Sequence, residues 1–437
     1  MNTIKIKNTI NFGAYFLAFM LIEAFVNTRA VMVSDSSNVN YIYSIGLVFT
    51  ALGYILYDYV ANKSHINITF LFSIVAIISL LLFSFIDNFY IFLTSAYICL
   101  LSVGFLGCHM HKQLAIYIKD KHYIFQLSIS MSIVIIIQYI LQLVNNSNAD
   151  IIVAALMLLV LSINQNTDVS VEIPKISDDT FHSHIKSALP YILLVCLMSF
   201  ILGLEDSIVV YKNATGELSL FSYVRLFYAL GLICAGLISE INNNAYLSLI
   251  TICTMLLSVI SVIFIGSESS FYNISMSIMY FYCGFYVLFL TVKFMEVSPA
   301  VAGYGRIVRS LATAVIVLVT TIVGTRLTYT HCIIFSCIFI IAIILIATFM
   351  GVLVSPQERV IVENDLYPVF FEKYQFTAKE KEVFIKLVDS EDTVISIAAD
   401  LGISRRVLQR HIASIYEKTG VQTRSGLIKC LYSFSKY

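Results

Sequence analysis

The residues whose types and spacing most clearly suggest a chemistry lie in one short segment near the end of the 437-residue chain. They are Ser404, Arg405, Arg406, Gln409 and Arg410. On a helix that begins after a serine cap, this spacing places the long polar side chains near the N-terminus. In the major groove of DNA, arginine can donate two hydrogen bonds to a guanine edge, and glutamine can donate one and accept one at an adenine edge. The segment therefore has the residue types of a base-reading helix.

The charge around this segment has one sign. Between Leu401 and Tyr437 the chain carries seven lysines and arginines against one acidic residue, Glu417. Two of the basic residues, Lys418 and Arg424, are placed for contacts with phosphates. A basic cluster alone is more often a solvated surface or a membrane-facing patch. Combined with the helix signals around it, the cluster favours binding to nucleic acid.

Four helices are predicted to position these residues. Thr377 and Glu380 form a capping box, so a helix should follow. A second short helix runs to Leu401 with Asp392 or Thr393 as its cap, Gly402 makes a turn, and Ser404 caps the third helix. That helix ends at Gly420, and Thr423 can cap a fourth. The predicted inward residues are Val383, Phe384, Leu387, Val394, Ile397, Ala398, Leu408, Ile412 and Ile415.

From 376 to 437 the sequence resembles the LuxR-type (GerE-like) helix-turn-helix domain. The positions that match the family pattern are Phe376, Thr377, Glu380, Val383, Ile397, Ala398, Leu401, Ile403, Ser404, His411, Ile415, Lys418, Val421 and Arg424. The resemblance implies DNA binding as a homodimer that pairs through the last helix, about Thr423–Phe434. The Thr-Val-Lys of the family's reading helix is Val407-Leu408-Gln409 here, which implies a different preference for DNA sequence.

The rest of the chain has the composition of a membrane protein. Overall, 59% of the residues are apolar and 12% are charged, whereas a soluble chain is about half apolar and a quarter charged. The nine cysteines form no CxxC pair, and eight lie in or beside apolar segments, so we expect small buried hydrophobes. The first apolar run follows Lys5 and Lys7 without a cleavage pattern and is expected to be an uncleaved span.

Twelve segments are long and apolar enough to be expected as membrane spans. They are centred in 10–32, 41–61, 67–86, 88–108, 123–144, 149–163, 187–210, 217–239, 245–265, 270–293, 304–325 and 329–353. A polar break at Asn164–Lys186 divides them six and six. The second and eighth spans each end in a small residue and a carboxylate, Gly53 with Asp58 and Gly236 with Glu240. This layout resembles the major facilitator superfamily of transporters.

The positive charges between the spans predict the orientation. With the N-terminus inside, the basic residues on the cytoplasmic face are Lys5, Lys7, Lys63, Lys112, Lys119, Lys121, Lys175, Lys186, Lys293, Arg306 and Arg309. The opposite face holds Arg29, Lys212 and Arg326. Eleven against three satisfies the positive-inside rule. An even number of spans then places both termini in the cytoplasm.

Ionisable residues inside the spans are the candidates for a membrane site, because they are costly there and usually face an interior cavity. They are Glu23, Arg29, Glu205, Asp206 and Arg225. Ligand or proton sensing is one interpretation, and structural pairing of Glu23 with Arg29 and of Asp206 with Arg225 is the other. The histidines at 109, 111, 182 and 184 lack a framing cysteine or carboxylate, so we expect no metal site. We also expect no cofactor and no enzymatic activity.

The sequence predicts an all-α protein in three parts. Residues 1–354 form a transporter-like membrane domain of about twelve spans with a six-plus-six repeat, 355–375 a linker, and 376–437 a four-helix LuxR-type domain. The leading hypothesis is a one-component transcriptional regulator in the bacterial inner membrane, which senses an unknown small molecule and binds a chromosomal operator. One alternative is a functional secondary transporter with a fused autoregulatory DNA-binding domain. Another is a transporter whose C-terminal domain binds protein.

Overall fold

The computed structural model describes residues 2–34, 36–60, 68–86, 88–120, 122–144, 147–167, 178–216, 222–241, 244, 246–265, 272–323, 329–352, 366–389 and 394–434. Throughout these ranges the regular structure is helical, with no strand. The chain divides into two compact units, Met1–Ser355 and Pro356–Tyr437. We call them the membrane unit and the C-terminal unit.

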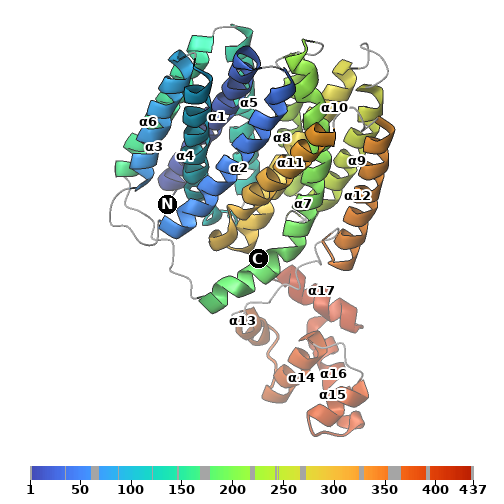
Figure 1. Cartoon of the computed structure of the whole chain (residues 1–437). Helices are drawn as coiled ribbons and strands as arrows, with labels where there is room; N and C mark the ends of the chain where they lie inside the picture. Colours follow the sequence, from blue (N-terminus) through green and yellow to red (C-terminus); the bar gives the residue numbers. More distant parts are fainter. Residues whose placement is uncertain are drawn as a thin grey trace. The chain divides into compact units, whose positions relative to one another are not determined.

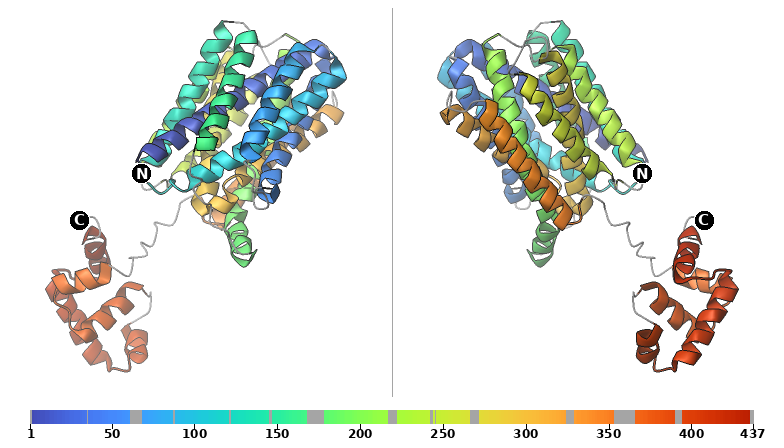
Figure 2. Two further views of the ribbon diagram at one scale, coloured as in Figure 1. Left: turned by 90° about the vertical axis from the view of Figure 1, so that its left-hand side faces the viewer. Right: turned by 90° about the vertical axis from the view of Figure 1, so that its right-hand side faces the viewer.

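The membrane unit is a helical bundle (Figures 1 and 2). Its helices are α1 (Asn2–Val33), α2 (Ser36–Val60), α3 (Ile68–Phe85), α4 (Phe89–Ala115), α5 (Tyr123–Leu143), α6 (Ser147–Thr167), α7 (Asp178–Ala214), α8 (Leu226–Ser239), α9 (Leu247–Ile265), α10 (Tyr272–Val297), α11 (Tyr304–Val323) and α12 (Tyr329–Phe349). Each of the twelve predicted spans corresponds to one of them. Among the described residues, eight helices are long and apolar enough to cross a membrane, and four apolar helices are shorter.

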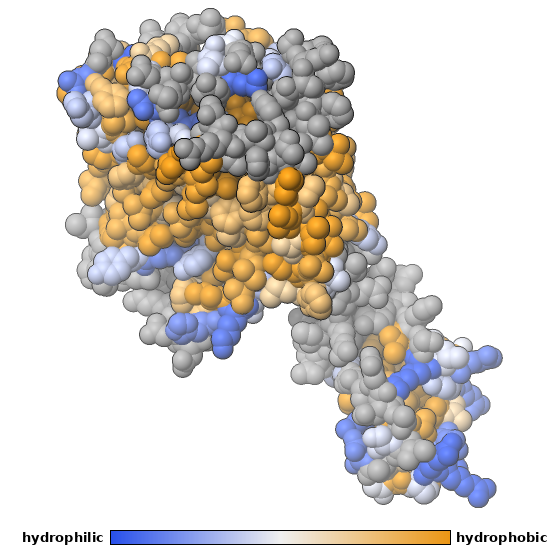
Figure 3. Space-filling model, turned by 45° about the vertical axis from the view of Figure 1, so that its right-hand side comes forward, coloured by the Kyte–Doolittle hydropathy of each residue, from blue (hydrophilic) through white to orange (hydrophobic). Residues whose placement is uncertain are grey.

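The outer surface of this unit is apolar. On the face shown in Figure 3, hydrophobic residues form a belt with hydrophilic residues toward its two ends. Large apolar side chains such as Phe85, Ile322 and Phe349 are exposed. A soluble protein rarely exposes so large an apolar surface, whereas lipid tails solvate it. Composition and fold together make this unit a multi-pass membrane domain.

Within each half, glycines allow the second and fourth helices to pack closely. A Cβ atom added at Gly104 of α4 would lie 2.2 Å from the Thr50 carbonyl oxygen of α2. In the second half, a Cβ atom at Gly284 of α10 would lie 2.6 Å from the Tyr228 carbonyl oxygen of α8. Small residues let helix backbones approach this closely in membranes. The second and fourth helices of each half therefore pack in the same way, as expected for a six-plus-six repeat.

Some polar residues lie elsewhere than predicted. Asn164 and Lys186, the predicted ends of the polar break, lie inside α6 and α7. Lys293, Arg306 and Arg309 were assigned to the cytoplasmic face; they lie in α10 and α11, and the first two are buried. Fewer basic residues in loops therefore support the predicted orientation. Lys63, Lys121, Lys175 and Arg326 lie outside the described residues.

The C-terminal unit has its own core. Its helices are α13 (Leu366–Lys373), α14 (Ala378–Asp389), α15 (Val394–Asp400), α16 (Arg405–Thr419) and α17 (Arg424–Phe434). Phe370 and Phe371 of α13 are buried in this core with Phe384 and Leu408. The segment 355–375, predicted as a linker, thus contains a helix that packs on the unit. The second cap predicted at Asp392 or Thr393 lies outside the described residues.

Candidate functional site

The helix α16 presents the residues that suggested DNA reading. Ser404 caps the helix, since its Oγ accepts a hydrogen bond of 3.4 Å from the Val407 backbone N–H. Leu408 and Ile415 are fully buried on the inner side, as predicted. The side chains of Arg405, Arg406, Gln409 and Arg410 are exposed on the outer side. The result is a polar, mostly basic face at the N-terminal end of the helix.

A tight turn holds α16 against α15. Gly402 has φ of +63°, a left-handed conformation that favours glycine because it has no Cβ. The Ile403 backbone N–H donates to the Ala398 carbonyl at 3.0 Å across the turn. Ile397 and Ala398 of α15 are buried beneath it. The turn predicted at Gly402 is confirmed, and it fixes the direction in which α16 leaves α15.

Lys418 and Arg424, predicted to contact phosphates, also have partners inside the unit. The Lys418 ammonium donates to Glu380 Oε2 at 2.6 Å and to the Gln375 carbonyl at 3.0 Å. Arg424 Nε donates to the Leu387 carbonyl at 2.7 Å. Both side chains therefore help to join helices of the unit. The sequence carried no signal for these long-range partners.

Two carboxylates of α7 lie in the interior of the membrane unit. Glu205 is buried, and Ser258 of α9 donates to its Oε1 at 2.8 Å, while its Oε2 has no hydrogen-bond partner among the described residues. Asp206 accepts a hydrogen bond of 3.3 Å from the Tyr43 hydroxyl of α2. This second bond joins the two halves of the bundle. The adjacent acids thus face different neighbours.

A pocket in the first half lies beside these groups. It is formed by α1, α2 and α4, and its polar lining residues are Glu23, Asn27, Tyr43 and Thr50. Glu23 and Tyr43 also act electrostatically on Arg309 of α11. The structure thus brings Glu23, Asp206 and Arg309 into one neighbourhood between the halves. Arg309 was assigned to the cytoplasmic face, although its position inside the predicted span 304–325 also made it an ionisable residue within a span.

Arg225 and Arg29 lie apart from that pocket lining. The Arg225 guanidinium donates to Gln138 Oε1 at 3.1 Å and lies 5.7 Å from the centre of the Tyr280 ring. Gln138 in turn donates to the Met20 carbonyl of α1. These bonds connect α5 with α1 and with the second half of the bundle. Arg29 is half-buried in α1.

The histidines have partners of other kinds. His109 Nδ1 forms a hydrogen bond of 2.8 Å with the Tyr57 hydroxyl, and His111 Nδ1 one of 2.7 Å with the Gly107 carbonyl. His182 is exposed and His184 half-buried on α7. Among the described residues, no three histidines, cysteines or carboxylates gather as a metal site would require.

The sequence matches no family model and none of the curated proteins with which it was compared. A solved structure does match: the human organic anion transporter MFSD10 (TETRAN). The match has a TM-score of 0.54 at 16% sequence identity and covers 78% of this chain and 98% of that chain. At this identity the likeness is one of fold. The membrane unit therefore shares the fold of that transporter.

Proposed function

We propose that the chain is a secondary transporter of the bacterial inner membrane with a fused DNA-binding unit. The observation that carries the transport part is the transporter fold together with charged side chains placed between its two halves. Ionisable groups are costly inside a membrane and mark solute or ion pathways. The membrane unit would bind a solute between its halves and open to either side in turn.

The C-terminal unit would bind DNA. In this proposal α15, the turn at Gly402 and α16 form a LuxR-type helix-turn-helix, and α16 enters the major groove. Its exposed face offers Arg406 and Gln409 to base edges and Arg405 and Arg410 to bases or phosphates. By resemblance to the family, two chains would pair through α17 on the operator. Both termini would then lie in the cytoplasm.

A regulator that senses a solute without moving it is the second candidate. The C-terminal unit favours this candidate, because a DNA-binding unit fused to a membrane unit could respond to a solute that the membrane unit binds. This was the leading hypothesis from the sequence. The likeness to a transporter supports transport more strongly than sensing alone. The human protein is named for organic anions, and at 16% identity that name leaves the solute of this chain to be inferred from its own residues.

A binding experiment tests the DNA assignment. The fragment 366–437, which has its own core, is purified and a preferred duplex is selected from random DNA. Replacing Arg406 or Gln409 with alanine should cost about 1–3 kcal/mol, unequally across variants of that duplex. The matched control is Lys379→Ala, since Lys379 is an exposed cation that pairs with Glu382 on α14. If the fragment shows no salt-dependent DNA binding, the assignment is wrong.

An uptake experiment separates the two candidates. The full chain is reconstituted into liposomes, and accumulation of labelled organic acids and amines is compared with empty liposomes. A transporter should accumulate a solute of one charge class. A sensor should show no uptake of any of them, while the same solutes change DNA binding by the full chain. If a solute is taken up but does not change DNA binding, the chain is a transporter whose membrane unit does not control the C-terminal unit.

A further inference from the structure

Arg306 is a buried cation near the start of α11. It follows the short turn Pro299–Val301, and its side chain packs against the first half of the bundle. The residue is 6% exposed, and its guanidinium carbon lies 5.8 Å from the centre of the Phe16 ring of α1. Arg306 thus places a positive charge at the junction of the two halves.

No carboxylate compensates this charge in the described part of the chain. No acidic oxygen there lies within 4 Å of the guanidinium, and the buried Arg306 Nε has no hydrogen-bond partner. Another buried cation, Lys293, lies 2.9 Å from Glu296. One turn along α11, Arg309 has Glu23 as an electrostatic neighbour. A buried charge without a partner is unfavourable, so the fold holds Arg306 at a cost that an anionic ligand would offset.

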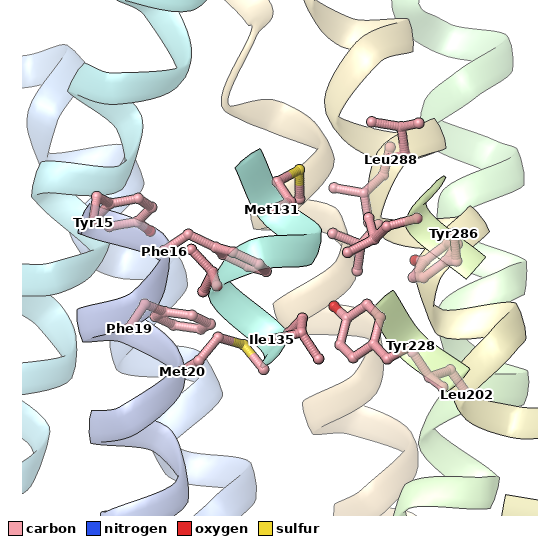
Figure 4. Close-up of a cluster of buried hydrophobic side chains, with 14 of the residues drawn as sticks. Tyr15, Phe16, Phe19, Met20, Met131, Ile135, Leu202, Tyr228, Tyr286 and Leu288 are labelled. Carbon is pink, nitrogen blue, oxygen red and sulfur yellow. The ribbon is translucent and has the colours of Figure 1, made fainter. Parts of the chain in front are cut away.

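Two tyrosines and a histidine lie near Arg306. Tyr15, Tyr54 and His111 are all close enough to interact with it electrostatically. The Tyr15 and Tyr54 hydroxyls share a hydrogen bond of 3.1 Å, and His111 Nε2 is buried without a hydrogen-bond partner in the described structure. Figure 4 shows Tyr15 and Phe16 on α1 within the cluster that lies between the halves. Aromatic side chains and one guanidinium are complementary to a ligand that has an apolar part and a single negative charge.

The pocket of the first half lies next to this group. Phe19, one turn along α1 from Phe16, lines it, and so does Thr50, one turn along α2 from Tyr54. Arg306 and the aromatic cluster do not line this pocket themselves, so a solute that binds between the halves would have to extend past it to reach them. The carboxylates Glu23 and Asp206 lie toward the other end, where they would disfavour a second negative charge.

We propose that Arg306 is the anchor for an organic monocarboxylate, which it would bind through paired hydrogen bonds while aromatic rings cover the apolar part. This rests on the proposed function, because it names the solute class of the same membrane unit. A dianion would leave one charge unmatched, and an amine would be repelled by Arg306.

The experiment follows thermal unfolding of the full chain in detergent with a thiol-reactive dye, since Cys99 and Cys108 are buried. The probes are benzoate, inorganic phosphate and benzylammonium. Benzoate at saturating concentration should raise the melting temperature by about 4 °C or more. Arg306→Gln should abolish that shift and, without ligand, should melt above the unchanged protein, because it removes an uncompensated charge. Arg306→Lys should keep part of the shift.

Lys293→Gln is the matched control, since it removes a buried cation that has a partner. It should melt lower than the unchanged protein and keep the benzoate shift. The inference is overturned if Arg306→Gln melts lower without ligand, if benzoate still stabilises that variant, or if benzoate has no effect on the unchanged protein. Stabilisation by benzylammonium alone would also overturn it and point to Glu23 and Asp206, while transport itself would stand.

Discussion

Glu380 is a buried carboxylate that holds two helices of the C-terminal unit together. Its Oε2 accepts hydrogen bonds from the Thr377 backbone N–H at 2.8 Å and from Lys418 at 2.6 Å, and its Oε1 accepts one of 2.6 Å from Ser414. Burial alone would raise the pKa of Glu380, but Lys418, Ser414 and Thr377 outweigh it and lower the pKa to about 2. The first turn of α14 is thereby tied to the C-terminal half of α16, whose N-terminal half carries the exposed basic face.

We expect Glu380→Gln or Lys418→Met to destabilise the fragment 366–437 by about 2–3 kcal/mol at pH 7. Lys418→Met leaves the buried Glu380 carboxylate without its cation, and Glu380→Gln removes the charged acceptor of three hydrogen bonds. Because the folded state lowers the pKa of Glu380, its contribution should be complete above about pH 4.5 and should fall as the pH drops toward 2. Urea unfolding followed by circular dichroism at pH 7 and pH 3 measures both effects. Glu382→Gln, at an exposed carboxylate, should change little.

Either of two outcomes would contradict this role of Glu380. Equal stability of Glu380→Gln and the unchanged fragment would mean that the hydrogen bonds contribute no net free energy. An undiminished difference between them at pH 3 would mean that the carboxylate is not the source of the pH dependence.

At the scale of helices, the α2–α4 contact depends on two glycines. Gly53 and Gly104 face the opposite backbone, and a Cβ atom at either would lie 2.0 Å and 2.2 Å from a carbonyl oxygen. Backbone cannot move aside as the end of a flexible side chain can. The same contact recurs between α8 and α10 through Gly231 and Gly284. These four positions therefore set the distance between the helices in each half.

Gly104→Ala should lower the melting temperature of the full chain, because the added methyl group forces α2 and α4 apart. Overpacking of this kind typically costs about 1–3 kcal/mol. Ile98→Ala, at an exposed position of the same helix, is the control and should have a smaller effect. The thiol-dye melt in detergent measures both variants. An unchanged melting temperature for Gly104→Ala would show that the two helices can separate at little cost.

The sequence predicted most elements because their signals are local. Apolar length predicts the spans, and the capping box at Thr377 predicts the start of α14, where Glu380 N–H lies 3.4 Å from Thr377 Oγ1. The helix α13 was missed, because its aromatic residues acquire partners only in the folded unit. The burial of Arg306 could not be predicted either, since a cation near the end of a predicted span usually reaches the polar surface. Whether α13 packs on the core and whether Arg306 is buried depends on residues that are distant in the sequence.

At the scale of the whole molecule, the two units have separate cores joined by a short connection. The core of the C-terminal unit includes Phe370 and Phe371, so the chain is already part of that unit from α13 onward. About 13 residues separate Val352, the last described residue after α12, from Leu366, which is at most about 45 Å of extended chain. Under the proposed function, DNA would therefore have to approach the membrane, and pairing of two C-terminal units would depend on how two membrane units approach.

A longer connection should separate DNA binding from the response to solute. We expect that about 20 Gly/Ser residues inserted between the units would keep the affinity for DNA but weaken the effect of a solute on it, because a flexible chain relays little of the membrane unit's change. DNA binding by the reconstituted full chain, with and without benzoate, measures this. An insertion of the same length before Lys5 is the control and should preserve the response. If the variant with the long connection responds normally, coupling is not mechanical, and another partner must carry the signal.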